Sequence, residues 1–147
     1  MPLYTSTAAR GVKIRAANAG QTALSGVETV IDFNVTDYND DTSLYTVSLA
    51  ANTITVANAG LYVVGASVRV GIAAAPGERS SLIGVDGSTV TEFNLPVGTG
   101  SPCVLPTTSL LKLTAGAVID LRLYSTGGDV AVDSDAERMT WLAIAKL

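Results

Sequence analysis

The hydrophobic pattern divides the chain into short β-rich runs separated by turn-forming residues at intervals of about 8–12 residues. These breaks fall at Asn18–Gly20, Tyr38–Asp41, Asn58–Gly60, Ala75–Gly77, Asp86–Gly87, Gly98–Gly100, Ala115–Gly116 and Thr126–Asp129. No stretch has the 3.6-residue period of an amphipathic helix. Short strands at this spacing are typical of a sandwich or barrel, so the pattern predicts an all-β domain.

Two segments alternate between apolar and polar positions most clearly, 61–70 and 118–124. The apolar positions of each fall on one face, and they are Tyr62, Val64, Ala66, Val68 and Val70 in the first and Ile119, Leu121 and Leu123 in the second. Such a strand places one face on a core and the other largely toward solvent. Asp86-Gly87 predicts a tight hairpin between 80–85 and 88–93, because this dipeptide tolerates the positive φ of a type I′ turn.

The last strand, 139–145, is apolar on both faces. Trp141, Ala143 and Ala145 fall on one face, and Leu142 and Ile144 fall on the other. A strand of this kind needs two apolar surfaces to contact, whereas a two-layer sandwich offers only one within the subunit. The simplest source of the second surface is a neighbouring subunit. The alternative is a loop of the same chain that covers the face.

The segment from Phe33 to Ala66 resembles the signature of the C1q domain family. Phe33, Asn39 and Leu44 stand at the spacing of its first half, and Gly60-Leu61-Tyr62 matches its Gly-x-Tyr. The segment departs from the signature in a gap three residues longer before Ile54 and in aliphatic residues at three aromatic positions. The resemblance covers roughly residues 12–147.

This resemblance implies a ten-stranded antiparallel jelly-roll sandwich of the C1q/TNF kind that forms a compact homotrimer, with its last strand near the threefold axis. Residues 1–11 would then be an N-terminal arm ahead of a domain at 12–147. The expected interface residues, which lie on one face of the last strand and just beyond it, are Trp141, Ala143, Ala145 and Leu147.

Composition agrees with an oligomer and limits the partners. Charged residues make up 15% of the chain, against about 25% in an average soluble domain, so something else is expected to cover part of the outside. The net charge of −4 argues against a nucleic-acid partner, because phosphates require basic surface. No apolar run reaches the roughly 18 residues of a transmembrane helix, so no membrane insertion is expected. The first twenty residues lack the apolar core of a signal peptide.

The sequence lacks the residues on which most enzymes depend. It contains no histidine, which removes the commonest general base at neutral pH and the Ser-His-Asp triad. Cys103 is the single cysteine, which excludes an intrachain disulfide and an ordinary zinc site. No P-loop or dinucleotide motif occurs. We therefore expect no catalytic residue, no enzymatic activity and no cofactor.

Two acidic clusters fall in turns, and the one near the carboxyl end is a candidate calcium site. Its members are Asp129, Asp133 and Asp135, whereas the other cluster holds Asp37, Asp40 and Asp41. Calcium prefers several oxygen ligands from such loops. Neither cluster has EF-hand spacing, and Asp favours turns for its local hydrogen bonds. Solvated turns without metal are therefore the expected state of both clusters.

Three functions fit a trimeric head without catalytic chemistry. The first is a virion structural protein, meaning a phage capsid decoration or head-fibre protein that docks through its N-terminal arm, because trimers suit threefold sites on a shell. The second is a receptor- or glycan-binding adhesive knob of a fibre or cell surface, with 71–78 and 95–106 as its recognition loops. The third is a secreted cytokine-like ligand, which the absence of a recognisable leader makes the least favoured.

Overall fold

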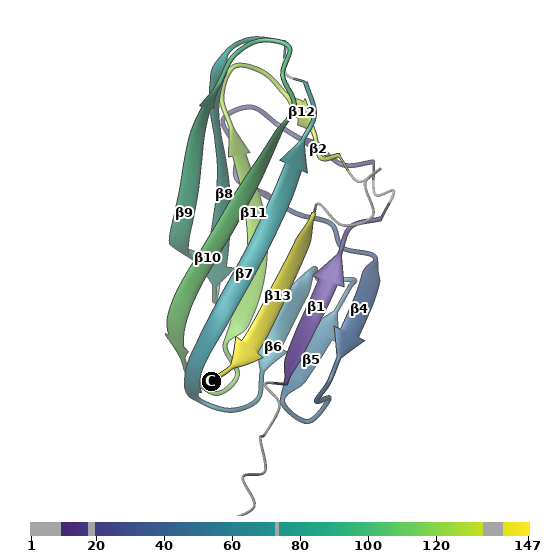
Figure 1. The fold of residues 1–147 in the computed structure, drawn as a ribbon, viewed down its shortest axis with the longest axis vertical. Coiled ribbons are helices and arrows are strands. Elements are labelled where there is room, and N and C mark those ends of the chain that lie inside the picture. Colours follow the sequence, from purple (N-terminus) through teal and green to yellow (C-terminus); the bar gives the residue numbers. More distant parts are fainter. Residues whose placement is uncertain (1–9, 18–19, 73, 134–139) are drawn as a thin grey trace, which may run out of the picture.

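The computed structural model describes residues 10–17, 20–72, 74–133 and 140–147. Every regular element in these ranges is a β-strand. All paired strands are antiparallel, and the two main sheets face each other as two layers (Figure 1). The predicted all-β sandwich is confirmed.

The five-stranded sheet carries both ends of the described chain. In spatial order its strands are β10 (Cys103–Leu113), β7 (Gly60–Val70), β13 (Trp141–Lys146), β1 (Gly11–Arg15) and β4 (Val35–Asn39). The C-terminal strand β13 therefore lies in the middle of the sheet, between β7 and β1. Both of its edges are paired, and one of its faces is turned away from the second sheet.

The six-stranded sheet supplies the other layer. Its order is β5 (Tyr45–Ser48), β6 (Thr53–Val56), β11 (Val118–Ser125), β8 (Gly77–Val85) and β9 (Ser88–Val97), with β3 (Thr29–Val30) also paired to β11. The short strands β2 (Thr22–Ala23) and β12 (Val130–Ala131) pair with each other. Ten strands thus lie on the two main paths, which is the number that the C1q-like resemblance implies.

The core forms where the predicted alternation places it. The apolar positions of β7 and β11 are at most 1% exposed, and they are Tyr62, Val64, Ala66, Val68, Val70, Ile119, Leu121 and Leu123. The signature positions Phe33, Leu44 and Ile54 are buried in the same core. They serve packing, and Tyr62 adds a hydrogen bond from its hydroxyl to the Asn58 carbonyl at 2.7 Å.

The hairpin between β8 and β9 also agrees with its prediction. Asp86 and Gly87 both have positive φ, 51° and 81°, as a type I′ turn requires. The Asp86 carboxylate accepts a hydrogen bond from the Val118 amide at 2.9 Å, which ties the turn to β11. Both strands are longer than predicted, since β8 begins at Gly77 and β9 continues to Val97.

Candidate functional site on the outer face of the five-stranded sheet

The side of the five-stranded sheet turned away from the core is built mainly from apolar and small residues. We call it the outer face. Because neighbouring strands are in register, its residues line up in cross-strand rows. The central rows are Leu110–Val63–Ala145–Gly11, Thr108–Gly65–Ala143–Lys13–Tyr38 and Pro106–Ser67–Trp141–Arg15–Val35. A face with this many apolar side chains and few charges is unusual on a monomer.

Trp141 is the largest side chain on the outer face, and its indole ring lies against the sheet at Gly65. A Cβ atom at Gly65 would stand 3.5 Å from two atoms of the indole ring, so the ring rests directly above this glycine. The Lys13 ammonium lies 5.4 Å from the centre of the ring, a cation–π distance. Trp141 is therefore fixed on the sheet and remains half-buried.

A shallow apolar hollow of about 260 Å³ surrounds this indole. It is lined by Tyr38, Val63, Gly65, Thr108, Trp141, Ala143, Ile144 and Ala145. Toward the end of the sheet where β13 finishes, three leucines extend the apolar surface, and Leu61, Leu110 and Leu147 are 42%, 58% and 68% exposed. Contiguous exposed apolar surface of this kind is typical of sites that contact a protein, a membrane or a ligand.

Charged groups lie mainly toward the sides of the outer face, where they pair within the subunit. Lys13 and Arg15 share the carboxylate of Asp37 on β4. Near the opposite corner, Arg69 pairs with Asp133 at 3.1 Å. These cations already have partners in the protomer, and Lys13, which also lies over the Trp141 ring, is the charge nearest the apolar centre of the face.

The structure brings the predicted interface residues together. Trp141, Ala143 and Ala145 form a column on the outer face, because alternate residues of a strand share one side. Leu147 follows them and is largely exposed. Leu142 and Ile144 point into the core with at most 1% exposure. Within the described residues no loop segment is paired across this column, so the contact with another subunit stays a prediction.

Neighbouring strands contribute residues to the outer face that were not among the predicted interface residues. The strongest additions are Leu61, Val63, Gly65 and Leu110 from β7 and β10. Their signal in the sequence is weak, since Leu61 and Val63 only interrupt the polar side of a strand that otherwise alternates. The sequence does not show that β7 lies beside β13, and this neighbourhood is what joins the four residues to Trp141.

Both ends of the described chain are held together at one end of the sandwich (Figure 1). The Tyr45 hydroxyl donates to the Arg10 carbonyl and accepts from the Lys146 amide, each at 2.9 Å. Burial raises the pKa of this hydroxyl. Strand β1 already begins at Gly11, and residues 1–9 of the predicted arm lie outside the described residues. The arm therefore enters the fold at a fixed point beside the C-terminal strand.

The candidate calcium ligands are engaged by protein groups where the structure describes them. The Asp129 carboxylate accepts the Ser25 amide at 2.9 Å, and Asp133 pairs with Arg69. Asp135 lies outside the described residues. In the described part of the chain, no group of three His, Cys, Asp or Glu residues could hold a metal ion.

The other acidic cluster is also bound by its neighbours. Asp41 accepts from the Ser43 hydroxyl at 2.5 Å and from Arg10 at 3.1 Å. The hydrogen bond from Ser43, followed by that from Arg10, lowers the pKa of this carboxyl. Asp40 accepts the Gly11 amide at 3.2 Å. These contacts fit carboxylates that shape a turn.

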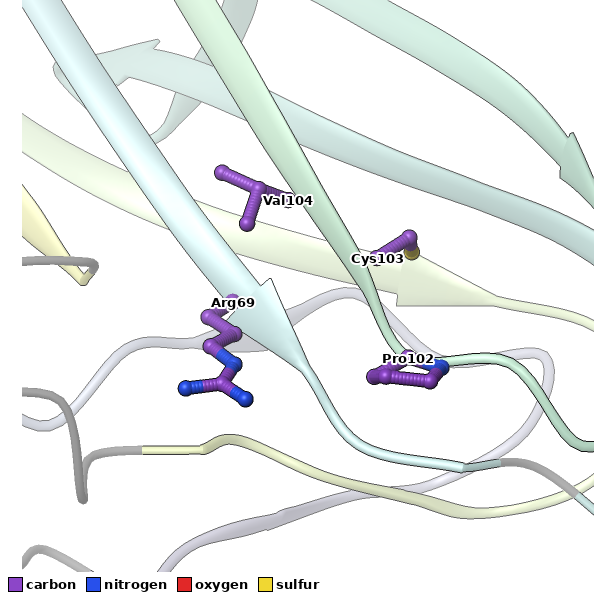
Figure 2. Close-up of a pocket in the computed structure, with 4 residues that line it drawn as sticks. All are labelled: Arg69, Pro102, Cys103 and Val104. Atoms are coloured by element: carbon purple, nitrogen blue, oxygen red, sulfur yellow. The ribbon is translucent and has the colours of Figure 1, made fainter.

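The recognition loops expected at 71–78 and 95–106 are shorter than predicted. Strand β8 already begins at Gly77, β9 continues to Val97 and β10 begins at Cys103, so the second loop spans only 98–102. β-Branched and apolar residues on either side of its glycines extend the two strands. An open pocket of about 270 Å³, lined by Arg69, Pro102, Cys103 and Val104, lies beside this loop (Figure 2).

Comparison with known proteins shows the fold and goes no further. No family model and no curated protein matches the sequence. Among solved structures, Eiger TNF from S. frugiperda matches with a TM-score of 0.70 at 13% identity, over 95% of this chain and 94% of that one. Murine APRIL at pH 5.0 matches with a TM-score of 0.71 at 10% identity, over 95% of this chain and 100% of that one.

The chain therefore has the C1q/TNF-like jelly-roll fold, which confirms the fold that the Phe33–Ala66 segment indicates. At these identities the likeness shows the fold alone. Separately, the described residues contain no helix long and apolar enough to cross a membrane.

Proposed function

We propose that this protein is a non-enzymatic homotrimer that assembles through the outer face of its five-stranded sheet. The observation that carries the proposal is the continuous apolar surface around Trp141, which joins the hollow beside Ala143 to the exposed leucines 61, 110 and 147. Covering apolar surface is the main driving force of protein association. A C-terminal strand in the middle of this sheet is then buried on both faces.

The arrangement of charges favours a packed and dry contact. Lys13 and Arg15 are already paired with Asp37, so closure over the centre of the face does not strand these two cations. Lys112 makes no ion pair with a described residue, but it is exposed on the edge strand β10, at the rim of the face. Burying an unpaired charge costs several kcal/mol, as an order of magnitude, and no such charge stands at the centre of the central rows. The expected number of subunits, three, is an analogy with the C1q/TNF-like class that the Phe33–Ala66 segment resembles.

For the biological role we propose a virion decoration or head-fibre protein that docks through its N-terminal arm. Residues 1–9, Met-Pro-Leu-Tyr-Thr-Ser-Thr-Ala-Ala, carry no charged side chain, which suits contact with a protein shell. Arg10 is fixed beside the end of β13, so three arms of a trimer leave from one end of the assembly. A threefold particle suits threefold or quasi-threefold sites on a capsid.

The adhesive knob of a fibre or cell surface is the second candidate, and one feature favours it. Opposite the termini, backbone and side-chain hydrogen bonds hold the loops together. The Glu78 amide donates to the Thr126 hydroxyl at 2.9 Å, and the Thr126 amide donates to the Glu78 carbonyl at 3.0 Å. Loops fixed in this way on a rigid scaffold suit recognition of a partner.

Native mass spectrometry of the purified protein tests the assembly. We expect wild-type protein to be a trimer and Trp141→Asp to be a folded monomer, because Lys13 lies above the same site and can receive the new carboxylate. Trp141→Phe, which keeps an aromatic ring, should remain trimeric. A monomeric wild type, or a Trp141→Asp variant that is still fully trimeric, would contradict the proposed face.

Particle analysis separates the two roles. If the protein decorates a shell, it co-purifies with particles through a density gradient, and deletion of residues 2–9 abolishes this while the free protein stays trimeric. If it is a knob, the deletion leaves binding to cells or to a glycan array unchanged. Absence from purified particles would refute the decoration role.

A further inference from the structure

Arg79 is a buried cation without a counter-ion among the described residues. It points into the sandwich from β8 and is 1% exposed. Its Nη1 donates to the carbonyls of Glu78 and Thr126, whereas its Nη2 has no hydrogen-bond partner. No ion pair joins Arg79 to a described carboxylate. Since a buried charge normally has a partner, this guanidinium calls for an acceptor from somewhere else.

The register of the two layers places Cys103 within one two-residue step of Arg79 along the strands. The hydroxyls of Ser81 on β8 and Thr107 on β10 are hydrogen-bonded to each other across the core. Both strands run in the same direction (Figure 1), and steps of two residues keep to one face. Arg79 therefore lies one two-residue step before Ser81 along β8, and Cys103 lies two such steps before Thr107 along β10. The guanidinium extends beyond the level of its own backbone toward the Thr126 carbonyl, which brings it closer to the level of Cys103.

The thiol of Cys103 faces the core and is also close to solvent. Its side chain packs against the core, and Figure 2 shows it on the opposite side of β10 from Val104. An open pocket reaches the same residue beside Pro102. Burial raises the pKa of this thiol, and the charge of Arg79 offsets part of that rise.

We propose that Cys103 is an oxidative modification site whose sulfinate form is the missing counter-ion of Arg79. The oxidant is hydrogen peroxide, which enters through the pocket beside Pro102. A sulfinate carries one negative charge and two oxygens that accept hydrogen bonds. It can therefore neutralise the Arg79 guanidinium and accept a hydrogen bond from its unpaired Nη2. The modified residue then forms a charge-assisted hydrogen bond between the two sheets.

The oxidation proceeds in two balanced steps. In the first step the Cys103 sulfur attacks one peroxide oxygen, so that an S–O bond forms, the O–O bond breaks, and the thiol proton leaves with hydroxide as water. Sulfur loses two electrons, and the peroxide gains them. A second equivalent of peroxide converts the sulfenic acid to the sulfinic acid in the same way, with release of another water. The sulfinic proton then passes to solvent.

The first test measures stability after peroxide treatment. Oxidised wild-type protein should show two added oxygens on the peptide that contains Cys103, and it should melt about 3 °C or more above the reduced protein. Cys103→Ala, treated in parallel, corrects for oxidation of Met1 and Met139. If the sulfinate forms and the melting temperature falls or stays unchanged, the assignment is wrong. Failure of the peptide to gain oxygen overturns it equally.

The second test avoids oxidation altogether. Cys103→Asp supplies a fixed anion and Cys103→Asn is its neutral match, so we expect the Asp variant to melt higher than the Asn variant. In an Arg79→Gln background the order should reverse, because the buried carboxylate then has no cation. If Arg79→Gln does not fold, the Asp-against-Asn comparison in the Arg79 background decides alone. An Asp variant that melts at or below the Asn variant overturns the proposal, and neither test depends on the proposed trimer.

Discussion

Leu110→Asp is the sharpest probe of the outer face, because it changes the contact surface with little effect on the protomer. Leu110 is 58% exposed at the edge of the five-stranded sheet, beside Val63 in the register of β10 and β7. Fully burying a leucine side chain contributes about 1.5–3 kcal/mol, so covering its exposed part contributes about 1–2 kcal/mol per subunit. A carboxylate buried there adds a cost of about 2–3 kcal/mol, which Lys112, two residues along on the same face, reduces but does not remove.

Together these effects come to about 4 kcal/mol per subunit. Threefold symmetry repeats the change, so the trimer loses about 12 kcal/mol, which is a factor of about 10⁹ in its association constant. We therefore expect Leu110→Asp to be monomeric at micromolar concentration, with the circular dichroism spectrum of the folded wild-type protein. Sedimentation velocity measures the first property and far-ultraviolet dichroism the second.

Leu24→Asp is the matched control. Leu24 is similarly exposed, at 54%, but follows β2, which does not belong to the five-stranded sheet. This variant should sediment as wild type. The reasoning is refuted if Leu110→Asp keeps the wild-type association constant, or if both variants dissociate equally, since the effect would then be one of charge and not of the outer face.

Three further outcomes follow from the structure. Tyr45→Phe should cost about 1–2 kcal/mol in urea unfolding at pH 7, because its hydroxyl bridges two main-chain groups. Burial raises the pKa of Tyr45 above its ordinary value of 10.0. The contribution of the protonated hydroxyl to the free energy of unfolding is therefore complete below pH 10 and declines as the pH rises through the folded-state pKa. The Phe variant should not show this loss of stability at alkaline pH. Gly84→Ala should lower the free energy of unfolding by about 1–3 kcal/mol, because a Cβ there collides with the Asp120 carboxylate, and a wild-type denaturation midpoint would contradict this. EDTA should leave the melting temperature unchanged, since Asp129 and Asp133 already have protein partners, and a fall on chelation would restore the calcium hypothesis.

The sequence predicts the layers of this fold well because burial leaves a local trace. The alternation from Tyr62 to Val70 is a property of one strand and needs no knowledge of its neighbours, and the structure buries all its apolar positions. Asp86-Gly87 is equally local, since the type I′ turn is selected by the conformational freedom of two residues. Fold class and hairpins are therefore accessible without a structure.

The composition of the outer face could be predicted only in part, because it depends on which strands are neighbours. The column of Trp141, Ala143 and Ala145 is visible within one strand, whereas Leu110 joins it through two registers, from β10 to β7 and from β7 to β13. Antiparallel pairing between segments so far apart along the chain has no signature in either segment alone. The same limit hides the contact between Trp141 and Gly65, in which the indole ring lies on the neighbouring strand.

Arg79 shows the opposite case, in which a residue that alternation would place in the core is charged. In β8 it shares a face with Ser81 and Ile83, both fully buried, and a sequence pattern gives no reason to bury a cation there. Its two carbonyl partners hold the guanidinium in place without neutralising it. The outer face and Arg79 are thus incomplete in different ways within one protomer. A second copy can cover an apolar surface but cannot reach Arg79, and for that reason we assign its missing acceptor to Cys103 of the same chain.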